Sequence, residues 1–224
     1  MAVEAETDVD VRQLHRDLVD LHGVVERSES ERDGMRSLLT TILSQNVADE
    51  NTARAADSLF STYRDYREIE AAPLEELAET IRVAGLPETK AERIQRALER
   101  TREHTGGDYS LTFLDGMDTD AATEWLTAIK GIGPKTASVV LNFEFEKPTM
   151  AVDTHVERVS KRFGLVPGTA SNQQAHDVLN ELVPDDLKYE LHVLLVSHGR
   201  GHCAARNADC ANLVCESYCD CEFC

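Results

Sequence analysis

The chain has 224 residues, too few for three ordinary domains and enough to bury a substantial core, which predicts one domain or two interleaved lobes. Its 23 basic and 41 acidic residues give a formal net charge of −18, which argues against a simple basic nucleic-acid-binding protein. Hydrophobic residues make up 42% and aromatic residues 5% of the chain, a balance typical of a compact helical protein.

The acidic residues are spread along the whole chain, and only six of the basic residues are lysines. This pattern favours adaptation to concentrated salt, in which the Debye length falls to about 3 Å at about 1 M and a negative protein need not repel a polyanion at long range. The acidic start lacks a secretory signal, and no apolar stretch reaches the roughly 20 residues that span a bilayer. We therefore expect a cytoplasmic protein without a membrane segment.

Apolar residues recur with helical spacing along most of the chain, without convincing two-residue alternation, and this predicts an all-α fold. The segment from Thr105 to Thr119 is glycine-rich and is expected to form a loop. In chain order, the first expected helices run along Met35–Leu43, from an Asp49 N-cap through Phe60, from a first-turn Pro73 through Ile81, and from Pro87 through Leu98. Further helices are expected over Asp120–Ile129, through Ala137–Leu141, from an Asp153 N-cap through Phe163, and over Ser171–Leu182 and Leu187–His198.

The most informative motif lies between two of these helices, in the segment Trp125–Ala137. It contains Gly131-Ile132-Gly133-Pro134-Lys135, which predicts two helices joined by a tight hairpin. Glycine tolerates positive φ and close approach of another backbone, so such a hairpin can point N–H groups at a phosphate. An isolated Gly-x-Gly is more often an ordinary helix–helix turn, and the motif gains meaning only in combination with a second motif.

This second motif, Thr149-Met150-Ala151-Val152-Asp153-Thr154-His155-Val156, lies downstream of the hairpin. The two motifs together resemble the helix-hairpin-helix, loop and aspartate of base-excision glycosylases. Within that superfamily the chain resembles endonuclease III, and the resemblance extends from roughly Met35 to Cys221. The resemblance implies an all-α, two-lobed fold: a six-helix barrel lobe at 28–145 with the hairpin, and a second lobe from 1–27 and 146–224, with a DNA cleft between them.

By this resemblance, Lys135 is the nucleophile and Asp153 the essential carboxylate of a bifunctional DNA glycosylase and AP lyase acting on oxidised pyrimidines. Base excision with strand cleavage requires an amine and a carboxylate, because an amine can attack the deoxyribose C1′ and a carboxylate can stabilise the positive charge that develops on the sugar. Each residue also has an ordinary interpretation: a solvated lysine and a helix N-cap.

The resemblance also implies DNA contacts, because a base inside a duplex must be flipped out before it can react. Leu86 matches the position that wedges into the stack, although a core leucine is the alternative. The predicted DNA-binding set is completed by Asn46, at a position where many relatives carry glutamine, and by Lys90, Gly131 and Gly133. The expected partner is double-stranded DNA with damaged bases or abasic sites, bound by a monomer.

All six cysteines lie between Cys203 and Cys224, which favours a metal site over a disulfide framework. The resemblance implies a [4Fe-4S] cluster held in a C-x6-C-x2-C-x5-C pattern. Cys203 and Cys210 meet it, but Leu213 stands in the third position, and Cys215 is the substitute. The fourth ligand is Cys221 if two residues are inserted, or Cys219 if the total span is kept.

Three other interpretations stay open. The cysteines could hold zinc, together with His198 or His202, in a regulatory protein. The hairpin could belong to a DNA-binding module without catalysis, although such a module needs neither Lys135 nor Asp153. The chain could also be a glycosylase of the same superfamily with a different lesion preference, for a mismatch or for adenine.

Overall fold

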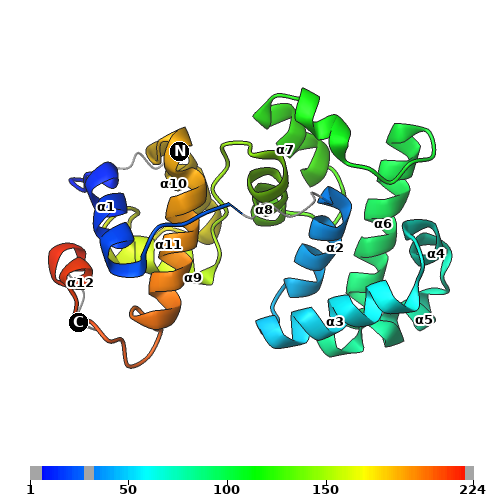
Figure 1. Cartoon of the computed structure of the whole chain (residues 1–224), viewed down its shortest axis with the longest axis horizontal. Coiled ribbons are helices and arrows are strands. Elements are labelled where there is room, and N and C mark those ends of the chain that lie inside the picture. Colours follow the sequence, from blue (N-terminus) through cyan, green and yellow to red (C-terminus); the bar gives the residue numbers. More distant parts are fainter. Residues whose placement is uncertain (1–6, 28–32, 220–224) are drawn as a thin grey trace. The chain divides into compact units, whose positions relative to one another are not determined.

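The computed structural model describes residues 7–27 and 33–219, and all regular secondary structure in these ranges is helical (Figure 1). The prediction of an all-α fold is therefore confirmed. The chain divides into two compact units, Ser30–Glu146 on the one hand and Met1–Glu29 with Lys147–Cys224 on the other. Each unit has a hydrophobic core of its own.

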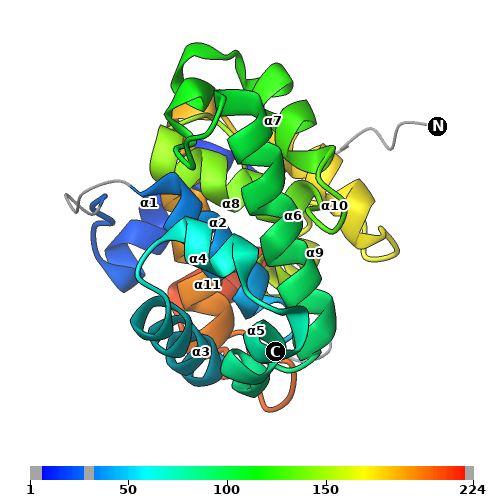
Figure 2. The same ribbon diagram turned by 90° about the vertical axis from the view of Figure 1, so that its right-hand side faces the viewer.

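The unit Ser30–Glu146 is built around α2 (Gly34–Ser44), whose apolar residues Leu38, Leu39, Ile42 and Leu43 are fully buried. This helix packs against α3, α6 and α8, and Figure 2 shows the unit from the side of α4, α5 and α6. The other elements are α3 (Asp49–Thr62), α4 (Tyr66–Ala71), α5 (Leu74–Thr80), η1 (Arg82–Ala84), α6 (Pro87–Thr105), η2 (Thr112–Gly116), α7 (Thr119–Thr127) and α8 (Pro134–Phe145).

Helix starts in this unit follow the local chemistry, with three departures from the sequence prediction. Pro87 is at the first helical position of α6, as predicted. Asp49, predicted to cap α3, instead occupies its first turn after Ala48, where a carboxylate still favours the positive end of the helix dipole. Pro73 precedes α5 as its N-cap residue, and the predicted loop at 105–119 contains the short helix η2.

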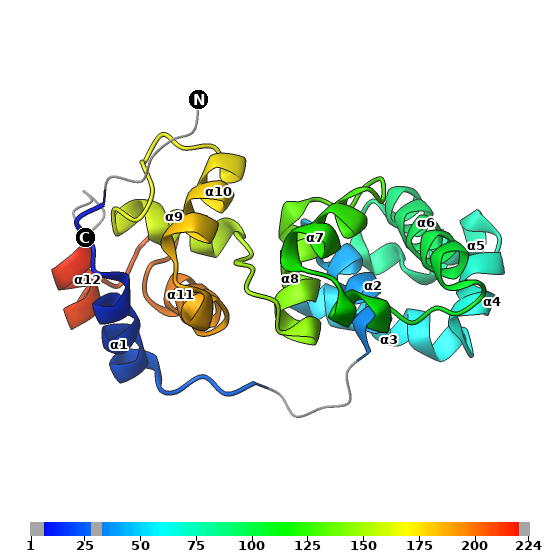
Figure 3. The same cartoon turned by 90° about the horizontal axis from the view of Figure 1, so that it is seen from above.

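The second unit combines both ends of the chain. Helix α1 (Val11–His22) packs on α11 (Lys188–Gly201) and α12 (Leu213–Tyr218), as Figure 3 shows. The Tyr218 hydroxyl donates to the Asp17 carboxylate at 2.5 Å, and burial followed by this bond raises the pKa of Tyr218 to about 12. The remaining elements are α9 (Thr154–Arg162), α10 (Asn172–Leu182), which starts at a Ser171 capping box, and η3 (Asp185–Leu187).

No helix in the ranges 7–27 and 33–219 combines the length and apolar character needed to cross a membrane.

Candidate functional site

The hairpin between α7 and α8 uses its two glycines differently. Gly131 has φ of +99°, and a Cβ there would lie 2.6 Å from the Arg93 Cγ, so both conformation and packing require glycine. Gly133 has φ of −98°, and a Cβ there would meet nothing within 4 Å. Of the two glycines, only Gly131 therefore has positive φ. Gly133 instead keeps an open, exposed space at the start of α8.

Lys135 lies in the first turn of α8 and is half-buried. Its helix begins at Pro134, and the N-cap residue Gly133 has no side chain to accept from the first-turn N–H groups. Within the unit Ser30–Glu146, as far as the structure describes it, no group forms a hydrogen bond or ion pair with the Lys135 ammonium. The amine is therefore not committed to a structural role in this unit.

A turn at the end of α2 carries Gln45 and Asn46. Asn46 is exposed and has a left-handed backbone with φ of +56°. The Gln45 Nε2 donates to Thr136 Oγ1 at 3.2 Å, and the Gln45 Oε1 accepts from Arg93 Nη1. Gln45 thus joins α2, α6 and the first turn of α8 next to Lys135. Sequence reasoning selected Asn46 and missed Gln45 and Arg93, although the position of Gln45 beside Asn46 was a signal.

Leu86 is an apolar residue held out of the core. Its side chain is 64% exposed, and it caps α6 with φ of +49° and ψ of +48°. Left-handed backbone is strained for a leucine, and the preceding Gly85 also has positive φ, at +66°. Because its side chain is exposed, the alternative of a plain core leucine does not apply to Leu86.

Lys90, expected to face DNA, is instead buried at 1% exposure. Its Nζ donates to the Leu43 carbonyl at 2.7 Å and to the Ala84 carbonyl at 2.6 Å. Burial, followed by the charge of Arg93, lowers the pKa of Lys90 to about 8. In this conformation the ammonium is occupied inside the protein and cannot reach a phosphate.

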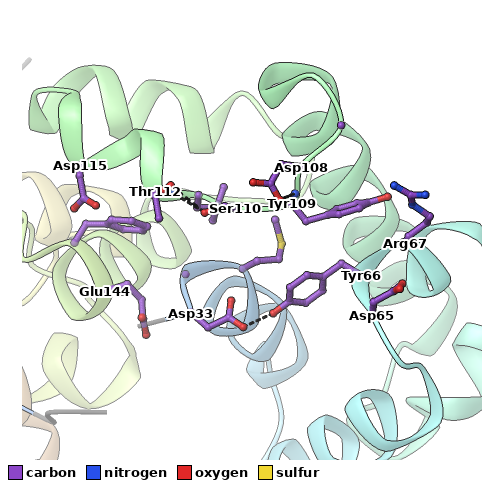
Figure 4. A pocket seen from close by; sticks show the side chains of 15 residues that line it. Asp33, Asp65, Tyr66, Arg67, Asp108, Tyr109, Ser110, Thr112, Asp115 and Glu144 are labelled. Carbon is purple, nitrogen blue, oxygen red and sulfur yellow. Dashed lines mark hydrogen bonds between the residues drawn. The ribbon is translucent and has the colours of Figure 1, made fainter. Parts of the chain in front are cut away.

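These residues gather at one end of the Ser30–Glu146 unit, where α2 ends and α6 and α8 begin. A pocket of about 720 Å³ lies at the other end, beside Gly34 and Phe145. Figure 4 shows its carboxylates with the single guanidinium of Arg67; the acidic lining residues are Asp33, Asp65, Asp108, Asp115 and Glu144. Helices of 11 and 12 residues, about 16 to 18 Å long, separate the two ends. The acidic lining disfavours phosphate, so this pocket is not the nucleic-acid site.

Asp153, in the second unit, is the N-cap of α9. Its Oδ1 accepts from the backbone N–H of His155 at 2.9 Å and of Val156 at 2.8 Å. The segment before it is fixed by Asn180, which donates to the Met150 carbonyl at 2.9 Å and accepts from the Met150 N–H at 2.8 Å. The predicted capping role is confirmed, and two hydrogen bonds on one oxygen fix the orientation of the carboxylate.

The cysteine segment offers two buried thiols with hydrogen-bond donors. Arg162 Nη1 lies 3.1 Å from the Cys203 Sγ, and Asn212 Nδ2 lies 3.4 Å from the Cys215 Sγ. Such donors suit thiolate ligands, so these two positions fit the cluster that the resemblance implies. Cys219 is half-buried, and Cys210 is disulfide-bonded in this structure and would bind iron only when reduced.

The complete ligand set is not assembled in the part of the chain that the structure describes. There, no group of three or more His, Cys, Asp or Glu side chains is arranged to hold a metal ion. Cys221, the favoured fourth ligand, and Cys224 lie outside the described residues.

Three histidines, His22, His198 and His202, lie beside this segment with ring centroids 5.3 to 5.6 Å apart. The His198 Nε2 is 3.3 Å from the Cys215 Sγ, and its Nδ1 is 3.1 Å from the His22 Nε2. Burial, with the neighbouring His22 and His202, lowers the pKa of His198 to about 4. His198 is therefore a neutral hydrogen-bonding partner of the thiol at pH 7.

Comparison with known proteins agrees with this geometry. Endonuclease III of Thermotoga maritima is 35% identical over 194 residues, covering 87% of this chain and 86% of the relative. A non-covalent endonuclease III–DNA complex has a TM-score of 0.79 at 28% identity, and a trapped endonuclease III–DNA covalent intermediate has a TM-score of 0.80 at 29% identity. Each comparison covers 94% of this chain and 94% of the solved chain.

Residues 39–185 match the HhH-GPD superfamily of base excision DNA repair proteins. This range includes the Gln45–Asn46 turn, Leu86, the hairpin, Lys135 and Asp153. The chain therefore belongs to the HhH-GPD superfamily and, within it, to the endonuclease III family of base-excision DNA glycosylases.

Proposed function

We propose that this protein is a bifunctional glycosylase and AP lyase that removes oxidised pyrimidines from double-stranded DNA, with Lys135 as the nucleophile. The observation that carries the proposal is the half-buried Lys135 amine at the start of α8, for which residues 33–146 of its unit provide no partner. Lys90, in contrast, is committed to carbonyl groups. An amine available next to a phosphate-binding hairpin suits attack on a DNA sugar.

The proposed reaction has two stages. The Lys135 Nζ, in its neutral form, attacks C1′ of the damaged nucleotide, and the C1′–N bond breaks as the base leaves with the electron pair and takes up a proton. Opening of the sugar ring gives an imine between Nζ and C1′. A base then removes a C2′ proton, the C3′–O bond breaks, and the 3′ phosphate leaves. Hydrolysis of the imine releases Lys135.

Asp153 supplies the negative charge in this scheme. A carboxylate near the sugar stabilises the positive charge that develops on it as the base departs, and accepts a proton from the attacking amine. The two N–H bonds to one oxygen of Asp153 keep the carboxylate oriented without rearrangement during the reaction.

The first-turn N–H groups of α8 would hold a DNA phosphate without sequence readout, and the open space at Gly133 would let the phosphate approach them. Leu86 would fill the gap that the flipped nucleotide leaves, and Asn46 would contact the orphaned base on the partner strand. A relative with 29% identity is described as a trapped covalent intermediate with DNA, which supports a covalent step here.

We also propose that the cysteine segment holds a [4Fe-4S] cluster through Cys203, Cys210 and Cys215, with Cys221 or Cys219 as the fourth ligand. Its contribution would be structural, because neither reaction stage transfers electrons. Arg158 ties α9 to the start of this segment by donating to the Gly199 carbonyl at 2.8 Å and the Cys203 carbonyl at 2.9 Å. A cluster that orders the cysteine segment would therefore also stabilise α9, the helix that Asp153 caps.

Borohydride trapping tests the nucleophile, because reduction of the imine leaves a stable covalent protein–DNA complex. We expect the parent protein to be trapped on DNA with an abasic site, and Lys135→Gln not to be trapped. Lys130→Gln, which removes the other amine of the hairpin, should still be trapped at saturating protein. Trapping of Lys135→Gln at the parent level would assign the nucleophile to another amine.

The same assay on a panel of lesions tests the substrate. The panel contains oligonucleotides with an oxidised pyrimidine, a G·T mismatch or an adenine mispair. We expect covalent product and base release to appear first with the oxidised pyrimidine. A preference for either mispair would favour the alternative glycosylase, and base release without trapping would remove the lyase step from the proposal.

Metal analysis of anaerobically purified, reduced protein tests the cofactor. We expect about four irons and acid-labile sulfide per chain, because thiolate-held [4Fe-4S] clusters contain both. Cys203→Ala and Cys215→Ala should lose the iron, and comparison of Cys219→Ala with Cys221→Ala identifies the fourth ligand. Stoichiometric zinc without sulfide would establish the alternative site, and full iron retention in the cysteine variants would reject the ligand set.

A further inference from the structure

A lysine buried at 1% exposure in the first turn of α6 requires an explanation, because an ammonium inside a protein is costly unless it is paired or hydrogen-bonded. The Lys90 Nζ contacts two backbone carbonyls that are far apart in sequence. The Leu43 carbonyl, at 2.7 Å, belongs to the last turn of α2, and the Ala84 carbonyl, at 2.6 Å, ends η1.

Each of these carbonyls lies just before a non-glycine residue with left-handed backbone. Asn46, with φ of +56°, follows Leu43 by three residues, and Leu86, with φ of +49°, follows Ala84 by two. Such conformations persist only where the surroundings hold them. The Lys90 backbone N–H also donates to the Leu86 carbonyl at 3.0 Å, as other residues would at this position of a helix, so only the two side-chain bonds are specific to lysine.

The same part of α6 extends this support to the hairpin. Arg93, almost one turn after Lys90, donates to Gln45, and Gln45 donates to Thr136 beside Lys135. The aliphatic part of Arg93 fills the space next to Gly131. The start of α6 therefore braces the Asn46 turn, the Leu86 wedge and the hairpin within a single unit.

We propose that Lys90 is a positioning residue that fixes Leu86 and Asn46 relative to each other, in the conformation in which they enter the DNA stack around a flipped nucleotide. This inference rests on the proposed function. The ordinary alternative is that the two hydrogen bonds of Lys90 only stabilise the fold.

The ionisation of Lys90 is compatible with this role. Its pKa is lowered to about 8 by burial and by Arg93, the cation that adjoins it on α6. A neutral amine keeps two N–H donors, as many as the two carbonyls need. The contacts to Leu43 and Ala84 can therefore persist on either side of this pKa.

Gln95 offers a matched control on the same helix. Its Nε2 donates to the Ala72 carbonyl at 2.8 Å and to the Glu70 carbonyl at 3.1 Å, with a longer contact of 3.5 Å to the Ile69 carbonyl, all in or just after α4 and away from the predicted DNA-facing residues. Lys90→Met and Gln95→Met each replace a donor that serves two carbonyls with an apolar chain of similar length. Both variants should lose thermal stability, and only Lys90→Met should affect the wedge.

The experiment measures strand opening with 2-aminopurine next to an abasic-site analogue in duplex DNA, together with the affinities for this duplex and for an undamaged one. Parent protein and Gln95→Met should raise the fluorescence and prefer the abasic duplex. Lys90→Met should lose on the order of tenfold of that preference, as expected for misplaced contact groups. In a Leu86→Ala background, Lys90→Met should lose less of that preference than it does in the parent, because one of the two groups it positions is already gone.

Equal preference in Lys90→Met and the parent, or the same loss in Gln95→Met, would overturn the positioning role. An additive effect in the Leu86→Ala background would overturn it as well. If Lys90→Met does not fold, Lys90→Gln, whose amide can still serve one carbonyl, takes its place in the same comparison. A parent protein that neither opens nor prefers the abasic duplex would instead contradict the proposed function.

Discussion

Single residues of one type have different roles in this protein, and the two hairpin glycines illustrate this. Gly131 is required by its own backbone and by Arg93, whereas nothing in the described protein around Gly133 requires glycine. Gly133 is the N-cap residue of α8, a position where glycine is favoured, and the space beside it is open. In our proposal a DNA phosphate fills it.

Replacing each glycine by alanine separates the two roles. Gly131→Ala should lower the free energy of unfolding by about 2 kcal/mol or more, because it combines strained backbone with a clash against Arg93. Gly133→Ala should cost less than about 1 kcal/mol in folding, but should weaken DNA binding several-fold because its methyl group stands where the phosphate would bind. Chemical denaturation and DNA titration of both variants measure this, and unchanged DNA binding by Gly133→Ala would contradict the phosphate site.

Residue chemistry also limited the prediction from sequence. Lys135 and Asp153 could be selected because each lies in a recognisable motif, and Leu86 because it matches a family position. Lys90 was selected by the same resemblance, yet a sequence does not show that its side chain turns inward, since this depends on where the carbonyls of Leu43 and Ala84 lie. Gln45 and Arg93 gain their roles only from contacts across three helices, which helical periodicity does not encode.

Among the elements, helices with strong local signals were predicted well. Pro87 starts α6, Ser171 caps α10, and Asp153 caps α9. The six-residue helices α4 and α12 were not predicted, because fewer than two turns carry too little periodicity to be recognised. The 12-residue helix α1 was not predicted either, although Asp10 was available as an N-cap signal. Helix η2 was not predicted for a similar reason, since the glycines around it favour a loop.

The start of α9 yields a test that separates capping from chemistry at Asp153. Asparagine is about as good an N-cap as aspartate, so Asp153→Asn should keep the unfolding free energy within about 0.5 kcal/mol, whereas Asp153→Ala should lose about 1 kcal/mol. Both changes remove the carboxylate and should lower base release on the order of 10²-fold to 10⁴-fold. Thermal melting and single-turnover base release measure the two effects. Full activity of Asp153→Asn would leave Asp153 as a cap and nothing more.

For the whole molecule, charge is the dominant property. A net charge of −18 produces repulsion among carboxylates that water alone does not remove. Many of the ion pairs lie at the surface, such as Arg12–Asp186, where both side chains are more than half exposed and such pairs contribute little. Stability and DNA binding should therefore depend on salt in ways that differ from those of a basic DNA-binding protein.

We expect the melting temperature to rise between about 0.1 and 1 M KCl, as the Debye length falls from about 10 to about 3 Å. For lesion DNA, four phosphate contacts would give a slope of log K against log salt of roughly −3.6. Wedge and hairpin contacts, which screening hardly affects, should keep nicking detectable in molar KCl. Sucrose at matched osmolality is the control for water activity. A melting temperature that falls with KCl, or a slope steeper than about −5, would contradict this account.

The interleaving of the second unit also has a consequence for synthesis on the ribosome. Helix α1 leaves the ribosome early, but α11, against which its buried residues Leu14 and Leu18 pack, begins 166 residues after α1 ends, from His22 to Lys188. At about 5 to 20 residues per second, α1 waits roughly 8 to 33 s for this partner. An isolated helix of 12 residues is marginal in water, so the nascent α1 remains an unfolded segment while Ser30–Glu146 is already complete. The half of the molecule that carries Lys135 is thus made first, and the half that carries Asp153 closes only when late-synthesised chain returns to the earliest part.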